Sequence, residues 1–221
     1  MIVTIDGPAG SGKSTAARAL AERLRFRFLD TGALYRTVAH ACVSRGVETS
    51  DADAVGTLAE GLSIEFDGNS VIADGVDVTE RLRSPGVARA ASLVALNPRV
   101  REALAVIQRD FAAGADVVTE GRDQGTIVFP HAECKFFLTA DETERARRRQ
   151  QDMQKTGVTV TIEEMLHQLE DRDRRDTGRL VAPLIPADDA ILLNTTSLSA
   201  EQVLEELERL VKRKLANPDD S

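Results

Sequence analysis

Short apolar runs alternate along the chain with segments in which apolar residues recur every three or four positions. The first run, 2–6, is rich in β-branched residues and predicts a buried parallel strand. Apolar residues then fall on one face of a predicted helix, at Ala17, Leu20, Ala21 and Leu24. A second short strand is predicted at about 27–30, ending in a polar turn at 31–32, and three further strands at about 116–119, 134–138 and 190–193, the first and last of these three as core strands. Helices are expected at about 33–44, 51–58, 85–95, 98–113, 142–153, 162–176 and 200–211.

Capping residues mark several helix starts. Asn97 precedes Pro98, which suits the first helical position. Thr161 is followed three residues later by Glu164, the spacing of a capping box. Ser50 or Asp51 and Ser199 are the expected caps of two further helices, and the last residues, 217–221, are expected to fray.

The segment 62–79 has a different pattern. Leu62, Ile64 and Phe66 alternate with polar neighbours, and Asp67, Gly68 and Asn69 form a hairpin signal. Two more short apolar stretches follow. The pattern predicts a small antiparallel meander inserted into an α/β chain, and a surface hairpin without function is the alternative.

Five apolar strands separated by helices predict an α/β fold, a five-stranded, mostly parallel sheet flanked by helices. Ligands of such sheets bind at the carboxyl ends of the strands. Polar segments follow each strand, at 6–12, 30–31, 120–123, 139–141 and 194–196. We expect these segments to converge on one site.

The first of these segments carries a phosphate-binding pattern. Residues 7–14 fit G-x-x-x-x-G-K-[ST], and the candidate loop comprises Gly7, Pro8, Ala9, Gly10, Ser11, Gly12, Lys13, Ser14 and Thr15. Glycines let backbone N–H groups approach phosphate oxygens, and the following helix adds partial positive charge. Lys13 is expected at the terminal phosphates and Ser14 at Mg²⁺. A chance glycine-rich turn is the alternative, against which the strand before and the helix after both argue.

Charge and composition narrow the function. The 221 residues carry a net charge of −8, which argues against a nucleic-acid polymer as partner. Of 28 basic residues 23 are Arg, and eight of these lie between Arg145 and Arg179, which indicates one concentrated anion site. No apolar run approaches 18 residues, so no membrane span is expected. The strand-like start and two isolated cysteines, Cys42 and Cys134, favour a reducing cytoplasm.

A phosphate-binding loop does not by itself separate ATPases, GTPases and small-molecule kinases. The guanine-reading sequence Asn-Lys-x-Asp is absent. The short chain, the insertion and the late arginine-rich helices favour a kinase of a small anion that is closed by a lid.

Five stretches then carry a closer resemblance, in order over nearly the whole chain: 5–15, 29–36 (LDTGALYR), 98–104 (PRVREAL), 121–130 (GRDQGTIVFP) and 175–184. In these the chain resembles the bacterial cytidylate kinases, of the nucleoside monophosphate kinase group. It departs from their pattern at Glu120, where Asp is expected, at Gln124, where Ile or Met is expected, and at Asn194, where an acidic residue is common.

The resemblance implies a cytidylate kinase that transfers a phosphoryl group from ATP to CMP or dCMP with Mg²⁺. It implies one P-loop kinase domain in three parts: a core (about 1–58, 114–145 and 183–216), a monophosphate-binding insertion (about 60–112) and a helical lid (about 146–182). The acceptor is already mostly dianionic at neutral pH, since the second pKa of a phosphate monoester is about 6. No general base is therefore needed.

Residue roles are also carried over from the resemblance. Lys13, Arg122, Asp123 and Arg179 are the expected catalytic residues. Thr31, Arg36 and Arg122 would hold the acceptor phosphate, Ser92, Arg101 and Asp123 would read cytosine, and Asp176 and Arg179 would lie at the sugar or phosphate. Lid candidates are Arg148, Arg149, Arg172 and Arg175. Glu120 would orient Mg²⁺ through water or serve a structural hydrogen bond.

Simpler structural roles remain open for three of these residues. Arg36 could lie on a solvated helix face, Arg101 could pair along its helix, and Asp176 could pair with neighbouring arginines. For Asp123 the chemistry is specific. A carboxylate accepts from the N4 amino group of cytosine, whereas the O4 of uracil would face it acceptor to acceptor.

Two other functions stay open at this stage. One is a P-loop kinase of another small anion, such as UMP, AMP or shikimate. The other is a nucleotide-binding switch without transfer chemistry. A monomer is expected, because no predicted helix has a long unused apolar stripe.

Overall fold

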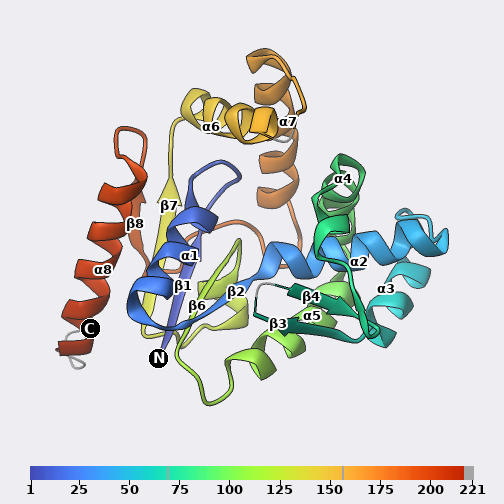
Figure 1. Ribbon diagram of the computed structural model, residues 1–221, viewed down its shortest axis with the longest axis horizontal. Helices are drawn as coiled ribbons and strands as arrows, with labels where there is room; N and C mark the ends of the chain where they lie inside the picture. The colour runs from blue at the N-terminus through green and yellow to red at the C-terminus, as the bar shows by residue number, and fades with distance from the viewer. Residues whose placement is uncertain (69, 156, 217–221) are drawn as a thin grey trace. The chain divides into compact units, whose positions relative to one another are not determined.

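Figure 1 shows the computed structural model, which describes residues 1–68, 70–155 and 157–216. The chain divides into two compact units. The first, called the sheet unit here, comprises Met1–Leu29 and Gly114–Ser221. The second, called the helical unit, comprises Asp30–Ala113.

The sheet unit is built on five strands in the order β2-β6-β1-β7-β8. The strands are β1 (Ile2–Asp6), β2 (Arg27–Asp30), β6 (Val117–Gly121), β7 (Cys134–Thr139) and β8 (Ile191–Asn194). β1 pairs in parallel with β6 and β7, and β7 pairs in parallel with β8. The predicted fold class, an α/β protein with a mostly parallel five-stranded sheet, is confirmed.

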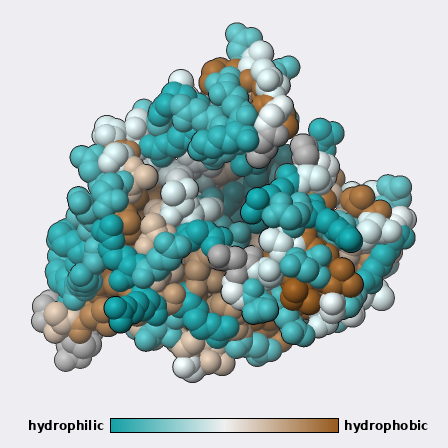
Figure 2. All heavy atoms as spheres, viewed as in Figure 1, coloured by the Kyte–Doolittle hydropathy of each residue, from teal (hydrophilic) through white to brown (hydrophobic). Residues whose placement is uncertain are grey.

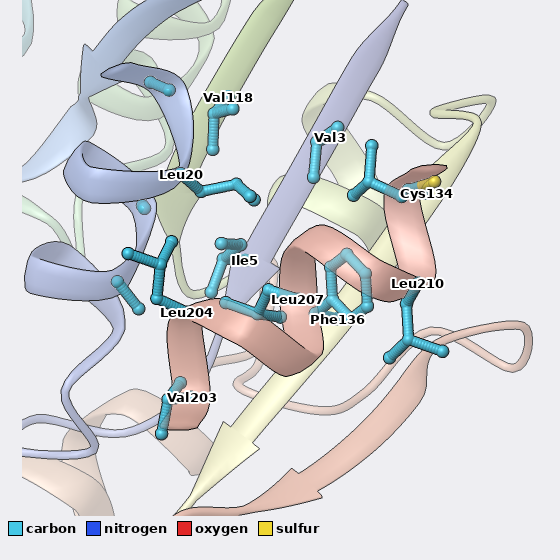
Figure 3. Packing of buried hydrophobic residues seen from close by; sticks show 14 of the residues in the cluster. Val3, Ile5, Leu20, Val118, Cys134, Phe136, Val203, Leu204, Leu207 and Leu210 are labelled. Atoms are coloured by element: carbon cyan, nitrogen blue, oxygen red, sulfur yellow. The ribbon is translucent and has the colours of Figure 1, made fainter. Parts of the chain in front are cut away.

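One face of this sheet is covered by α1 (Lys13–Leu24) and α8 (Ala200–Ala216). Figure 3 shows Leu204 and Leu207 of α8 turned toward Ile5 and Phe136 of the strands. Side chains alternate along a strand, so Val3 and Ile5 face this core while Thr4 faces the other side. The π-helix η2 (Gln124–Val128) packs on the side of the sheet that Thr4 faces. The contact is close, since a Cβ on Gly125 would lie 3.0 Å from Thr4 Oγ1.

A helix pair completes the sheet unit. α6 (Glu142–Lys155) and α7 (Ile162–Thr177) share a small apolar cluster with Ala9, formed by Ala146, Met165 and Leu169. The surface over α6 is mainly hydrophilic in Figure 2. The apolar side of the pair is thus used at the phosphate loop.

In its described residues the helical unit combines four α-helices with a three-stranded antiparallel sheet, β3-β4-β5. Its helices are α2 (Thr31–Arg45), α3 (Ala52–Gly61), α4 (Pro85–Val94) and α5 (Pro98–Ala112), and its strands are β3 (Ile64–Asp67), β4 (Ser70–Ala73) and β5 (Val76–Asp77). The 3-10 helix η1 (Thr79–Arg83) follows the strands. The predicted meander is confirmed, although Asn69 of its turn lies outside the described residues.

Most predicted caps are present. Asp51, rather than Ser50, accepts from Ala54 N–H, and Asn97 accepts from Arg99 N–H. Thr161 and Glu164 form the full capping box of α7. Ser199 accepts from Gln202 N–H before α8. The predicted fraying of 217–221 lies outside the described residues.

Two expectations about elements are wrong, and one element was not predicted. No turn separates β2 from α2, because the Asp30 carboxylate caps Ala33 N–H and the helix starts at Thr31. β8 is an edge strand, not a core strand, and Leu192 is 65% exposed, because an apolar run alone does not show how many faces are covered. The loop after β6 contains η2, which no pattern in this segment indicated.

Two further sequence expectations concern cysteines and membranes. Cys42 and Cys134, which show no pairing or metal-site spacing in the sequence, are buried free thiols, and burial raises the pKa of Cys134 to about 11. None of the helices in the described parts of the chain is both long and apolar enough to cross a membrane.

Candidate functional site

The phosphate-loop pattern lies between β1 and α1 and has the backbone of an anion cradle. Gly10 and Gly12 have φ values of 80° and 87°, which favour glycine. Gly12 is the N-cap of α1. Because glycine has no side chain, it makes no capping hydrogen bond to the first N–H groups of the helix. Gly7 lies against β7, where a Cβ would come within 2.1 Å of Leu138 O.

Lys13 begins α1 and is buried beneath this loop. Its Nζ donates to Pro8 O at 3.2 Å and lies 3.9 Å from Glu120 Oε2. Burial and the positive charge of Arg122 hold the pKa of Lys13 well below its usual range, and Glu120 opposes that shift. An incoming anion would therefore restore the charged ammonium.

Arg145 holds the loop from the α6 side. Its guanidinium Nη1 donates to Ala9 O at 3.3 Å and to Asp173 Oδ2 of α7 at 2.5 Å. A Cβ on Gly10 would lie 2.8 Å from Arg145 O. Arg145 belongs to the arginine-rich segment but is not among the predicted site residues, since nothing in the spacing distinguishes a buried arginine from an exposed one.

Arg148, a lid candidate, also contacts the loop. It donates to Thr195 O at 2.6 Å, to Thr195 Oγ1 at 2.9 Å and to Ser11 O at 3.4 Å, and it pairs with Glu144 at 2.7 Å. Thr195 Oγ1 in turn donates to Ser11 O or Thr139 O, at 3.0 and 3.1 Å. The segments after β1, β7 and β8 therefore converge, as expected. Thr195 is a residue that the sequence did not single out.

A buried cluster of opposite charges follows β6. Asp176 Oδ2 accepts from Arg122 Nε at 2.9 Å, and Asp176 Oδ1 accepts from Arg179 Nη2 at 2.6 Å. Arg172, another lid candidate, lies 3.9 Å from the same carboxylate. Burial raises the pKa of Asp176, but the three arginines outweigh it and hold the pKa below its usual range. Four predicted residues, separated by up to 57 positions, are thus brought together.

Asp123 precedes η2 and is 4% exposed. Its carbonyl accepts from Ile127 N–H and Val128 N–H. Gln124 is also buried, and its Oε1 accepts from Thr119 Oγ1 at 2.9 Å. Asp6, at the end of β1, accepts from the N–H groups of Gln124 and Gly125 at 2.9 and 2.8 Å. Burial raises the pKa of Asp6 to about 7, although these two hydrogen bonds act in the opposite direction.

The remaining candidates lie in two places. In the helical unit, Arg36 pairs with Asp30 at 3.1 Å and Thr31 is buried at the start of α2. Arg101 is 7% exposed and stacks over the ring of Tyr35 at 5.6 Å, and Ser92 donates to Arg89 O. In the sheet unit, Arg149 is half-buried on α6, and Arg175 donates to Asp171 O within α7.

Comparison with known proteins identifies the family of this chain. The family model described as cytidylate kinase matches residues 3–213. Cytidylate kinases of Salmonella paratyphi B and Salmonella newport are each 46% identical over 219 residues, which cover 97% of this chain and 96% of each relative. The chain belongs to the cytidylate kinase family. A solved structure from Thermus thermophilus is 20% identical, covers 97% of both chains at a TM-score of 0.50 and shows the same fold.

The departures from the family pattern have structural explanations in two cases. Glu120 is buried beside Lys13, so the longer side chain is accommodated as an ion-pair partner. The side-chain oxygen of Gln124 is buried and needs a hydrogen-bond donor, which the Thr119 hydroxyl supplies. Asn194 accepts from Thr196 N–H and Oγ1 at the exposed end of β8.

Proposed function

We propose that this member of the cytidylate kinase family transfers the γ-phosphoryl group of ATP to CMP or dCMP, forming ADP and CDP or dCDP. One observation carries this proposal. The sheet unit contains both a phosphate loop with a buried Lys13 and a buried cluster of Arg122, Asp176 and Arg179. A protein that bound only the phosphates of ATP at its phosphate loop would need no such arginine cluster. Alternatives with UMP, AMP or shikimate as acceptor, or without transfer, are not favoured by the family.

We also propose three functional parts, with a core at about 1–58, 114–145 and 183–216, a monophosphate-binding insertion at about 60–112 and a lid at about 146–182. The compact helical unit, Asp30–Ala113, supports a separate acceptor-binding part. The α6–α7 pair, which has its own apolar cluster with Ala9, supports a lid.

ATP binds at residues 7–15 in this proposal. The glycine backbone and the buried Lys13 suit the phosphates, and the exposed Ser14 at the start of α1 is available to Mg²⁺. Ser14 would hold Mg²⁺ together with the phosphates, and Glu120 would orient it through water. When bound, the ion would neutralise charge on the phosphates.

The acceptor needs cations and position rather than a base, because its phosphate is already dianionic. Arg122 and Arg179 are held by Asp176, which fixes both guanidinium groups. Thr31 and Arg36 would supply the rest of the phosphate site, and Asp176 would also contact the sugar. Ser92, Arg101 and Asp123 would read the base.

Among the lid candidates, the contacts favour different roles. Arg172 and Arg175 on α7 remain candidates for the transferring phosphoryl group. Arg148 already bonds to Ser11 O and Thr195 O and would support the loop instead. Arg149 remains a candidate by its position on α6.

An acceptor assay tests the proposal. ADP formation from ATP and Mg²⁺ is measured with CMP, dCMP, UMP, AMP and shikimate offered separately. Strong turnover with CMP and dCMP and weak turnover with UMP is expected. A better acceptor than CMP would contradict the base site, and no acceptor dependence would favour a nucleotide switch.

Asp123→Asn tests the base reader. An amide presents a donor as well as an acceptor, so the variant should tolerate the uracil O4 and narrow the CMP over UMP preference in kcat/KM by about tenfold or more. Asp171→Asn, at an exposed position of α7, is the matched control and should leave that ratio unchanged. An unchanged ratio in Asp123→Asn would remove Asp123 from the base site.

We further propose a cytoplasmic monomer whose partners are ATP and CMP or dCMP, with no membrane or nucleic-acid polymer. The acidic net charge of −8 supports the last point. Light scattering at assay concentration tests the monomer.

A further inference from the structure

The carboxylate of Asp6 joins two loops of the candidate site. Asp6 ends β1 and directly precedes Gly7 of the phosphate loop, and it is 4% exposed. Its two oxygens accept from the consecutive N–H groups of Gln124 and Gly125, at 2.9 and 2.8 Å. We propose that Asp6 is a positioning residue that sets the loop carrying Arg122 and Asp123, and so contributes to selection of the acceptor base.

The two donors are groups that the loop cannot satisfy itself. Gln124 and Gly125 are the first residues of η2, and the first N–H groups of a helix have no partner within it. η2 has five residues, so few internal hydrogen bonds hold it. Asp123, immediately before it, offers no side-chain cap. The start of η2 is therefore fixed from outside, by Asp6.

Close packing transmits this anchor to Asp123. A Cβ on Gly121 would lie 2.7 Å from Gln124 Cγ, and one on Gly125 would lie 3.0 Å from Thr4 Oγ1. The loop from 121 to 125 therefore has little room to shift while the Asp6 hydrogen bonds remain. Without them the backbone at Asp123 would lose the anchor at the start of η2, while the Arg122 guanidinium would keep its bond to Asp176.

The phosphate loop has anchors of its own. Arg145 holds Ala9 O, Thr195 and Arg148 hold Ser11 O, and Gly7 packs on Leu138 O. Loss of the Asp6 carboxylate should therefore act on the acceptor side more than on the ATP side. This inference deepens the proposed function and rests on it.

Asp6→Asn is the test, because the amide has the same shape but can accept with only one of its two ends. Kinetics are measured at pH 8 with CMP, UMP and MgATP each varied. We expect KM for CMP to rise about tenfold and the CMP over UMP ratio of kcat/KM to fall about tenfold, with KM for MgATP changed by less than about twofold. Amide hydrogen exchange at Gln124 and Gly125 should quicken by at least about tenfold.

Leu207→Val is the control for lost stability, since Leu207 lies in the core on the opposite face of the sheet. It should leave all three kinetic constants unchanged in the folded enzyme. Asp6→Ser, whose hydroxyl can accept one N–H group, replaces Asp6→Asn if the latter does not fold.

Unchanged CMP constants, or a rise in KM for MgATP as large as that for CMP, would overturn the inference. So would unchanged amide exchange at Gln124 and Gly125. If wild-type enzyme does not phosphorylate CMP, the proposed function fails, and the exchange rates alone then decide whether Asp6 holds the loop.

Discussion

Buried charges in the sheet unit have neighbours of opposite sign, and the cluster around Asp176 leaves a surplus of positive charge. Lys13 lies near Glu120, and Asp176 is shared by Arg122 and Arg179. A buried charge without a partner is costly, so each acidic group keeps its basic neighbours ordered. The surplus is what a pair of mutually repelling phosphates requires.

Asp6 gives a prediction for the pH dependence of stability. Burial raises its pKa from 3.8 to about 7 in the folded chain. Between these values the folded state binds more protons than the unfolded state, so stability falls as pH rises. The contribution is complete below about pH 4 and is lost once the pH passes about 7.

Asp6→Asn cannot titrate and isolates this effect. The free energy of unfolding of wild type minus that of Asp6→Asn, from urea denaturation at pH 4.5, 5.5, 6.5 and 8, should fall by on the order of 1 kcal/mol per pH unit up to about pH 7. It should then level off. A difference that stays flat from pH 5 to 8 would mean that the N–H groups of Gln124 and Gly125 keep Asp6 ionised throughout.

At the level of elements, local patterns predicted the structure where local physics decides it. The capping box of Thr161 and Glu164 lies within four residues, and both of its hydrogen bonds are present. The start of α2 was missed, because Asp30 serves both as the last residue of β2 and as the cap of Ala33. The exposure of β8 was missed as well, since its place at the sheet edge depends on strand order rather than on its own residues.

Thr161→Ala tests how far that cap stabilises the α6–α7 pair. Removal of the capping oxygen should cost about 1 kcal/mol and speed amide exchange in the first turn of α7. Thr161→Ser keeps the oxygen and should behave like wild type. Equal exchange in the two variants would show that packing of Met165 and Leu169, not the cap, holds this end of α7.

For the whole molecule, the motifs named candidate residues but did not show how those residues are held. The phosphate loop and the arginine-rich segment were evident from spacing and composition. The contacts that fix them were not, because Arg122 meets Asp176 across 54 positions and Arg145 meets Ala9 across 136. Side chains such as Asp6 and Thr195 acquire their role only when distant strands end side by side.

A substitution at Gly7 should therefore disturb both the fold of the sheet unit and its proposed nucleotide site. A Cβ there would lie 2.1 Å from Leu138 O, a backbone atom of β7 that cannot move without disturbing its pairing with β1. Gly7→Ala should cost more than about 3 kcal/mol and displace the phosphate loop.

Gly46→Ala is the matched control, because Gly46 has a φ of +67° at the end of α2 but nothing within 4 Å of an added Cβ. Backbone strain alone should cost it about 1 kcal/mol. Melting temperatures with and without MgATP separate the two cases, since a ligand stabilises only a fold that binds it. MgATP should raise the melting temperature of wild type and Gly46→Ala but not that of Gly7→Ala. If MgATP raised the melting temperature of Gly7→Ala as much as that of wild type, the phosphate loop would tolerate the added Cβ. Its position would then be determined by its contacts with α6 and α7.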